Sequence, residues 1–176
     1  MRESDALDLD LPQNVREESD AVISDCGLYR YHLIRRWGPG KCCVFVMLNP
    51  STADASADDP TIRRCRAFAK RFGCDALAVV NVYGWRATRP VELWRTPDPV
   101  GPLNDRFIRL ALDCAKRDDA PVVAAWGANA RPGRVLTVSR LGRFQCLGVT
   151  KAGAPRHPLY LRSDEALTPW PVASVA

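Results

Sequence analysis

Apolar and polar positions along the chain predict strands that alternate with helices. Residues 29–37 (YRYHLIRRW) and 42–48 (CCVFVML) predict two strands, joined in a hairpin by the turn at 38–41. The second strand is apolar on both faces, which suits the middle of a covered sheet. Three further apolar runs predict buried strands at 76–82, 121–126 and 144–149.

Helices are predicted between these strands. Asp59 followed by Pro60 is typical of a helix start, and an apolar stripe from Ile62 to Phe72 ends at Gly73. Similar patterns predict helices at 104–116 and 134–141, while the tail ALTPWP is expected to be irregular. Strands that alternate with helices favour a three-layer α/β/α sandwich with a mostly parallel central sheet.

The length of 176 residues and the 47% apolar content suit one domain, which we place at residues 26–176. No run of eighteen apolar residues occurs and the N-terminus is acidic, so we expect neither a membrane span nor a signal peptide. The seven cysteines form no C-x-x-C pair, which favours reduced core residues over a metal or redox site. We therefore expect a cytoplasmic protein.

The net charge of +5 is divided unevenly along the chain. Residues 1–25 hold eight acidic and two basic residues, so this acidic arm, which we expect to be flexible, carries −6. The remaining body then carries +11. Such a basic body is expected to attract a polyanion such as nucleic acid, although basic domains that bind nothing are equally common.

Polar residues stand where the predicted strands end. Asn49 follows the strand at 42–48, Asn81 lies at the end of the strand at 76–82, and His157 comes shortly after the last strand. In an open α/β sheet the ligand crevice lies beyond the carboxyl ends of the strands. Asn49 and His157 each precede a proline, which holds the preceding residue in an extended conformation. The other histidine, His32, lies within a predicted strand and is expected to be structural.

The segments Met47–Asp54 (MLNPSTAD), Asn81–Thr88 (NVYGWRAT), Ala125–Ala128 (AWGA) and Cys146–Tyr160 (CLGVTKAGAPRHPLY) resemble those of the domain of unknown function 1643. The similarity runs from about Tyr29 to Trp170. The order of Asn-Pro, Asn-Val and a late His-Pro also resembles the uracil-DNA glycosylase superfamily, which implies a glycosylase-like fold.

The glycosylase resemblance implies catalytic roles for Asn49, which would position a water molecule, and for His157. It also implies that Asn81 reads the pyrimidine edge, with Pro50 and Ser51 beside the base. These roles suit the reaction, because the base leaves as an anion that needs stabilisation and an amide can orient the attacking water. A neutral imidazole or an imidazolium can donate a hydrogen bond to the departing base. The implied function is hydrolysis of the N-glycosidic bond of uracil or another modified base in DNA, with no metal and no cofactor.

Contacts to DNA are expected around the same rim. An apolar wedge helps a base to leave the stack, and Leu159 and Tyr160 follow the histidine. Four basic side chains are expected to contact phosphates, namely Arg86, Arg89, Lys151 and Arg156. For the acidic cluster of Asp54, Asp58 and Asp59 we expect loop and helix-cap roles rather than a metal site.

The same residues also suit other functions. Leu159 stands where the glycosylases have serine, and Met47-Leu48 replaces their glycine-bearing lead-in, which suits a non-catalytic nucleic-acid or nucleotide-binding module. A hydrolase of free nucleosides or nucleotides would use the same chemistry without DNA. A serine or cysteine nucleophile ranks last, because neither residue stands in a nucleophile elbow.

Overall fold

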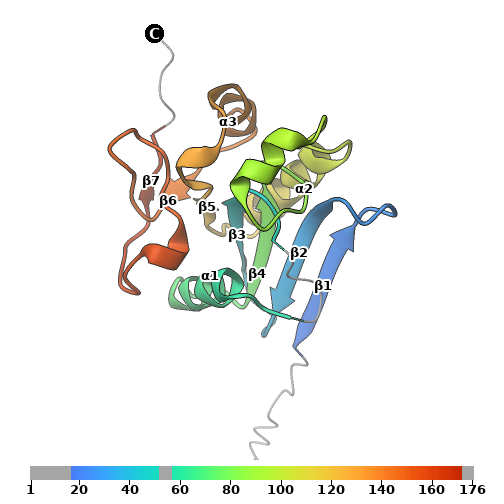
Figure 1. Ribbon diagram of the computed structural model, residues 1–176. Helices are drawn as coiled ribbons and strands as arrows, with labels where there is room; N and C mark the ends of the chain where they lie inside the picture. The colour runs from blue at the N-terminus through green and yellow to red at the C-terminus, as the bar shows by residue number, and fades with distance from the viewer. Residues whose placement is uncertain (1–16, 52–56, 172–176) are drawn as a thin grey trace, which may run out of the picture.

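The computed structural model describes residues 17–51 and 57–171, which form one seven-stranded sheet flanked by helices (Figure 1). The strands are β1 (Glu18–Ile23), β2 (Arg30–Arg36), β3 (Cys42–Met47), β4 (Ala76–Asn81), β5 (Val122–Ala124), β6 (Gln145–Cys146) and β7 (Thr168–Pro169). The helices are α1 (Pro60–Arg71), α2 (Asn104–Arg117) and α3 (Pro132–Ser139), with 3₁₀ turns η1 (Pro90–Arg95), η2 (Gly127–Asn129) and η3 (Pro158–Tyr160). The mixed α/β class expected from the sequence is confirmed.

The sheet is mixed, with strand order β1-β2-β4-β3-β5-β6-β7. Its four middle strands, β4, β3, β5 and β6, run parallel. The outer pairs β1–β2, β2–β4 and β6–β7 are antiparallel. Half of the described strand pairings are therefore antiparallel, and the expectation of a mostly parallel sheet is wrong.

The expected hairpin of residues 29–48 does not form, because β4 lies between β2 and β3. The turn at 38–41 instead wraps around the start of β4. The backbone N–H groups of Trp37 and Gly38 donate to the carbonyl oxygen of Asp75, and that of Gly40 donates to the Asp75 carboxylate at 2.9 Å. Strands β3 and β4 are buried along their whole length, which suits positions in the middle of the sheet with a strand on each side. The partly exposed β2 lies nearer the edge of the sheet.

Helices cover both faces of the sheet (Figure 1). On one face, Ile62, Cys65 and Phe68 of α1 pack against residues that include Phe45 and Leu77 of the sheet. On the other face, α2 and α3 contribute a second buried cluster with Ile108, Leu112 and Val138. The three-layer arrangement therefore follows from two apolar faces, each of which needs a cover.

The predicted start of α1 is confirmed. Asp59 is its N-cap, and the Asp59 carboxylate accepts a hydrogen bond from the backbone N–H of Ile62 at 2.8 Å. Pro60 occupies the first turn, and the helix ends before Gly73, whose φ of +72° continues the chain in a left-handed conformation. This cap fixes the position of the helix end that faces the site described below.

Both edges of the sheet contain a strand that the sequence did not predict. Residues 18–23 of the expected flexible arm form β1, which pairs with β2. The tail expected to be irregular contributes β7, which pairs with β6. Residues 1–16 of the arm lie outside the described residues. Short, exposed edge strands carry little apolar signal of their own, because pairing with a neighbour stabilises them.

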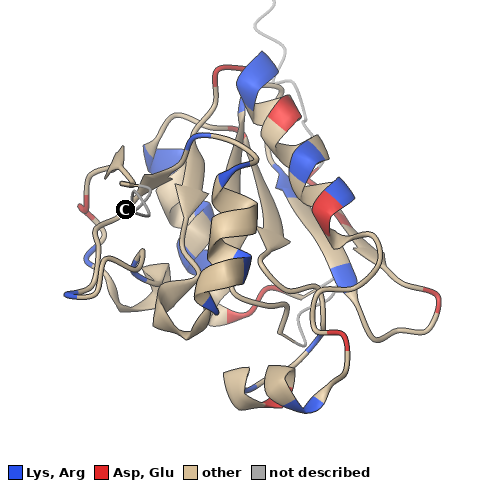
Figure 2. Cartoon of the chain, turned by 90° about the horizontal axis from the view of Figure 1, so that it is seen from above, with Lys and Arg blue, Asp and Glu red and all other residues tan. Residues whose placement is uncertain are grey.

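No helix in the described parts of the chain is both long and apolar enough to cross a membrane. Lys and Arg residues are distributed over several helices and loops, interspersed with acidic ones (Figure 2). The positive charge of the body is therefore not confined to one element.

Candidate functional site

A pocket of about 340 Å³ lies where β3 and β4 end, between the N-terminus of α1 and the turn η3. Its wall contains Asn49, Asn81 and His157, the three polar residues that the sequence placed at separate strand exits. Apolar side chains such as Met47 and Val79 form part of the same wall. The pocket lies at the low end of the size range of small-molecule sites and combines apolar lining with convergent polar groups, as such sites do.

Asn81 is the last residue of β4 and is 1% exposed. Neither its amide nitrogen nor its amide oxygen has a hydrogen-bond partner among the described residues. A buried polar group without a partner costs about 1–3 kcal/mol. Because this amide lines the pocket, a ligand or a water molecule there can remove that cost.

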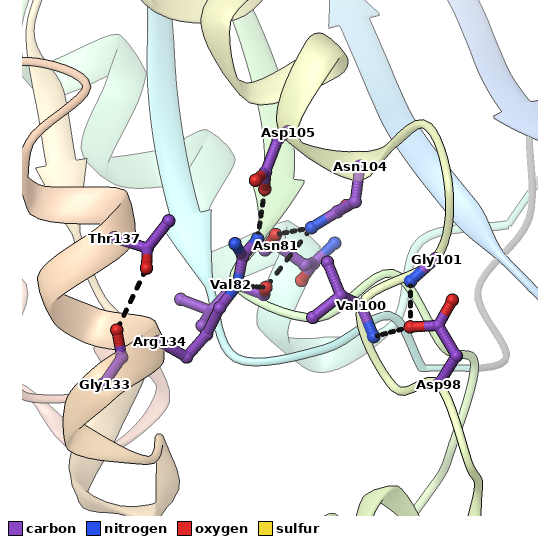
Figure 3. Close-up of polar contacts among 10 residues, drawn as sticks. All are labelled: Asn81, Val82, Asp98, Val100, Gly101, Asn104, Asp105, Gly133, Arg134 and Thr137. Carbon is purple, nitrogen blue, oxygen red and sulfur yellow. Dashed lines mark hydrogen bonds and ion pairs between the residues drawn. The ribbon is translucent and has the colours of Figure 1, made fainter.

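The backbone around Asn81 is held firmly from the other face of the sheet (Figure 3). The side-chain amide of Asn104, at the start of α2, donates to the carbonyl oxygens of Asn81 at 2.9 Å and Val82 at 3.2 Å. Arg134 of α3 also donates to the Val82 carbonyl oxygen at 2.8 Å and forms an ion pair with Asp105. These contacts fix the end of β4, and with it the position of the Asn81 side chain.

Two backbone carbonyl groups fix the orientation of the Asn49 side-chain amide. Its Nδ2 donates to the carbonyl oxygens of Pro50 at 3.0 Å and Ala87 at 2.8 Å. Since both partners are acceptors, the nitrogen is identified by its contacts and both of its hydrogens are used. The Oδ1 atom of this pocket residue remains as an acceptor, which can bind a hydrogen of a water molecule.

His157 precedes η3 and is held by the turn that follows it. The Nδ1 atom accepts a hydrogen bond from the backbone N–H of Leu159 at 3.3 Å. An accepting Nδ1 places the proton of the neutral ring on Nε2, so Nε2–H is the donor. Burial lowers the pKa of His157, and the negative charge of Asp59 opposes this effect. The neutral ring therefore prevails at neutral pH.

Asp59 belongs to the pocket as well as to the cap of α1. One carboxylate oxygen caps the helix, and the other accepts a hydrogen bond from the Ser51 hydroxyl at 2.5 Å. The predicted cap role is confirmed. The neighbouring Asp58 forms an ion pair with Arg35 at 2.7 Å, and Asp54 lies outside the described residues.

Several other predicted residues surround this pocket. Leu159 and the 79% exposed Tyr160 are part of its wall, and the rings of His157 and Tyr160 lie 5.8 Å apart. Pro50 is buried beside Asn49 without lining the pocket.

The four basic residues expected to contact phosphates lie off the pocket wall. Arg89 pairs with Glu92 at 3.1 Å, and Arg86 donates to the carbonyl oxygen of Gly27 at 3.0 Å. Lys151 and Arg156 are exposed on the segment that leads to His157.

Arg30 and Trp126 are the largest buried side chains of the wall that were not predicted as site residues. Arg30 of β2 is 2% exposed, and Trp126, which follows β5, is also 2% exposed. The Trp126 ring lies nearly perpendicular to that of Trp170, with centroids 4.8 Å apart. A charged residue inside a predicted strand was the available signal for Arg30, but strict alternation from Leu33 would put its side chain on the face opposite the pocket.

A larger hollow of about 920 Å³ lies at the opposite edge of the sheet, where β5 and β6 begin. Its lining includes Leu112, Lys116, Arg143 and Phe144, and none of the predicted site residues. The smaller pocket is the better candidate, because it contains a buried amide that lacks a partner in the described parts of the chain.

Fold and pocket together define a mixed α/β protein with a candidate ligand pocket, lined by apolar and polar side chains, at the carboxyl ends of parallel strands. The chain belongs to the family described as Protein of unknown function (DUF1643), whose model matches residues 30–159. The matched range contains Asn49, Asn81 and His157. No curated protein and no solved structure matched the chain.

Proposed function

We propose that this pocket binds a uracil-like base and that the protein hydrolyses the N-glycosidic bond of uracil or another modified base in DNA. The observation that carries the proposal is the Asn81 side chain, whose amide is 1% exposed, lacks a partner among the described residues and lines the pocket. A planar amide offers one donor and one acceptor side by side. The adjacent carbonyl and N–H of a uracil edge are complementary to this pair.

His157 would stabilise the departing base. The C1′–N1 bond breaks with its electron pair on the base, so negative charge develops on the ring and its carbonyl oxygens. A positioned Nε2–H donor stabilises such charge. The Leu159 contact to Nδ1 supports this role, because it keeps the proton on Nε2.

Asn49 would orient the attacking water. Its Oδ1 accepts a hydrogen from the water molecule, whose oxygen bonds to C1′ and whose proton passes to solvent or to the departing base. An amide is too weak a base to remove that proton early, but an oxocarbenium-like sugar needs only a well-placed water. The two backbone contacts of Nδ2 support this positioning role.

DNA as the partner is supported by the surroundings of the pocket. Leu159 and Tyr160 are exposed beside it and suit a wedge that fills the space of an extruded base. The exposed residues Arg89 and Arg156 adjoin the wall residues Pro90 and His157 in the chain, and Lys151 is exposed on the segment before Arg156, so all three are available to neutralise phosphates. A cytoplasmic location fits the proposal, because all seven cysteines are free.

The test is excision from oligonucleotides that contain uracil or another modified base, followed by alkaline cleavage of abasic sites. We expect strand scission with the wild type and none above background with Asn49→Ala or His157→Ala. Arg109→Gln, on the exposed side of α2, serves as the matched control and should retain activity. Tight binding without product, unchanged by Asn49→Ala, would favour a non-catalytic module. Hydrolysis of free nucleosides with weak salt dependence would favour a nucleoside hydrolase.

A further inference from the structure

A buried arginine lies in the pocket wall. Arg30 is 2% exposed, and its side chain lines the pocket with Val79 and Asn81 of the neighbouring strand β4. Its backbone N–H donates to the carbonyl oxygen of Gly84 at 3.0 Å, which fixes this part of β2 against the segment after β4. Arginine is rarely buried in proteins, so its position inside a ligand pocket calls for a chemical explanation.

A bulge in β2 aims Arg30 into the pocket. Val22 of β1 pairs with His32, whereas the next residue, Ile23, pairs with Arg30, so Tyr31 is one extra residue on β2. The Tyr31 ring stacks on Phe107 of α2 on the far face of the sheet. In a regular strand Tyr31 and Leu33 would share a face, but the bulge reverses the alternation and turns Arg30 towards the α1 face.

Arg30 is the cation of the pocket wall as the structure describes it. The other ionisable side chains there are Asp59, His157 and Tyr160. Asp59 accepts hydrogen bonds from the Ile62 N–H and the Ser51 hydroxyl, and burial keeps His157 neutral near pH 7 by lowering its pKa. A guanidinium carries five N–H donors, so it can contact the protein and a ligand at the same time.

We propose that Arg30 gives the pocket its preference for the anionic form of a pyrimidine base and thereby stabilises the base as it departs. This inference rests on the proposed function and names the charge state that the site favours. As the C1′–N1 bond breaks, the base gains the electron pair and becomes an anion. A buried positive charge on the pocket wall then attracts this product state more strongly than the neutral base in the substrate.

Binding of free bases tests the inference without any turnover. The wild type is titrated calorimetrically with 5-fluorouracil, which is more acidic than uracil, below and above the pKa of that base. Uracil, which stays neutral over the same interval, controls for pH effects on the protein. We expect the anion of 5-fluorouracil to bind about tenfold or more tightly than its neutral form. Uracil affinity should stay constant.

Variants assign the preference to the guanidinium charge. Arg30→Gln should abolish the preference, whereas Arg30→Lys, which keeps the charge, and Arg109→Gln on α2 should retain it. Thermal melts report whether Arg30→Gln folds, and a wild type without the preference overturns the inference even if this variant does not fold. Equal binding of both forms by the wild type, no binding of either, or an unchanged preference in folded Arg30→Gln would overturn the inference.

Failure of this inference differs from failure of the proposed function. Excision of uracil from DNA without a preference for the anion would leave the glycosylase function intact and remove the role of Arg30. A preference for the anion that Arg30→Gln abolishes, with no excision by the wild type, would leave the charge selectivity intact and remove the hydrolytic function.

Discussion

The backbone N–H of Leu159 donates to Nδ1 of His157 at 3.3 Å, and this contact determines which form of the ring the pocket contains. Protonation would place a hydrogen on Nδ1 and break the contact. Burial acts in the same direction, because it lowers the pKa of His157. The neutral ring with a proton on Nε2 is therefore the state on which the proposed chemistry depends.

We predict that His157 titrates below the usual histidine pKa of about 6.5. Activity should fall as the pH decreases through that lowered pKa and stay level above it. Because the unfolded chain binds the proton more readily, stability should also decrease as the pH falls below about 6.5. NMR titration of the imidazole resonances measures the midpoint, with His32→Gln used for assignment.

Asp59→Asn provides the control for this titration. The substitution keeps an oxygen for the helix cap and removes the negative charge that raises the pKa of His157. The midpoint should therefore move still lower. A midpoint at or above the usual value in the wild type would contradict the neutral-ring mechanism.

Asn81→Leu should leave stability within about 1 kcal/mol of the wild type, or increase it, because the buried amide has no hydrogen-bond partner to lose within residues 17–51 and 57–171. Base binding should be lost. Asn104→Leu is the matched control, since it removes an equally buried amide that donates to two carbonyl oxygens. It should cost about 2–3 kcal/mol. Urea unfolding measures both values, and a large loss of stability in Asn81→Leu would indicate a structural role for that amide.

Tyr160→Ala should reduce excision from duplex DNA about tenfold and leave excision from single-stranded DNA nearly unchanged. The exposed ring has no role in the core, and the cost of extruding a base arises only in the duplex. Single-turnover rates on the two substrates, which differ only in the complementary strand, give the comparison. An equal loss on both would place Tyr160 in base recognition instead.

Lys151→Gln and Arg156→Gln should each weaken DNA binding to the same extent for all sequences. Both side chains are exposed, and each phosphate contact removed should lower the slope of log K against log salt by about 1. Arg109→Gln, on the far side of the sheet, should leave the slope unchanged. Affinity measured across a series of salt concentrations separates this effect from base recognition, and unchanged slopes in both variants would exclude phosphate contacts there.

The sequence predicted the parts of the fold that repeat a strong local pattern. The capped start of α1 at Asp59-Pro60 and the buried runs of β3 and β4 were recognisable because each carries its own apolar signal. The order of the strands was not recognisable, because the turn at 38–41 is locally compatible with a hairpin of β2 and β3. Only the competition between β2 and β4 for a place beside β3 decides the order.

The site residues likewise include some that the sequence predicted and others that it did not. Asn49, Asn81 and His157 were predicted from their places at strand ends, and the structure brings all three to one pocket. Arg30 was missed because strict alternation puts it on the face of α2. The single-residue bulge at Tyr31 that reverses the alternation depends on pairing with β1, a strand that the sequence did not predict.

Whether the pocket binds a pyrimidine base can be measured by following the Asn81 side-chain amide by ¹H–¹⁵N NMR while uracil is added. We predict that the Asn81 Nδ2 and His157 Nε2 resonances shift together with one saturation curve, and that Asn81→Leu abolishes binding. If both resonances stay unchanged at saturating uracil, or if uracil binds equally well to Asn81→Leu, the pocket is not a site for a pyrimidine base.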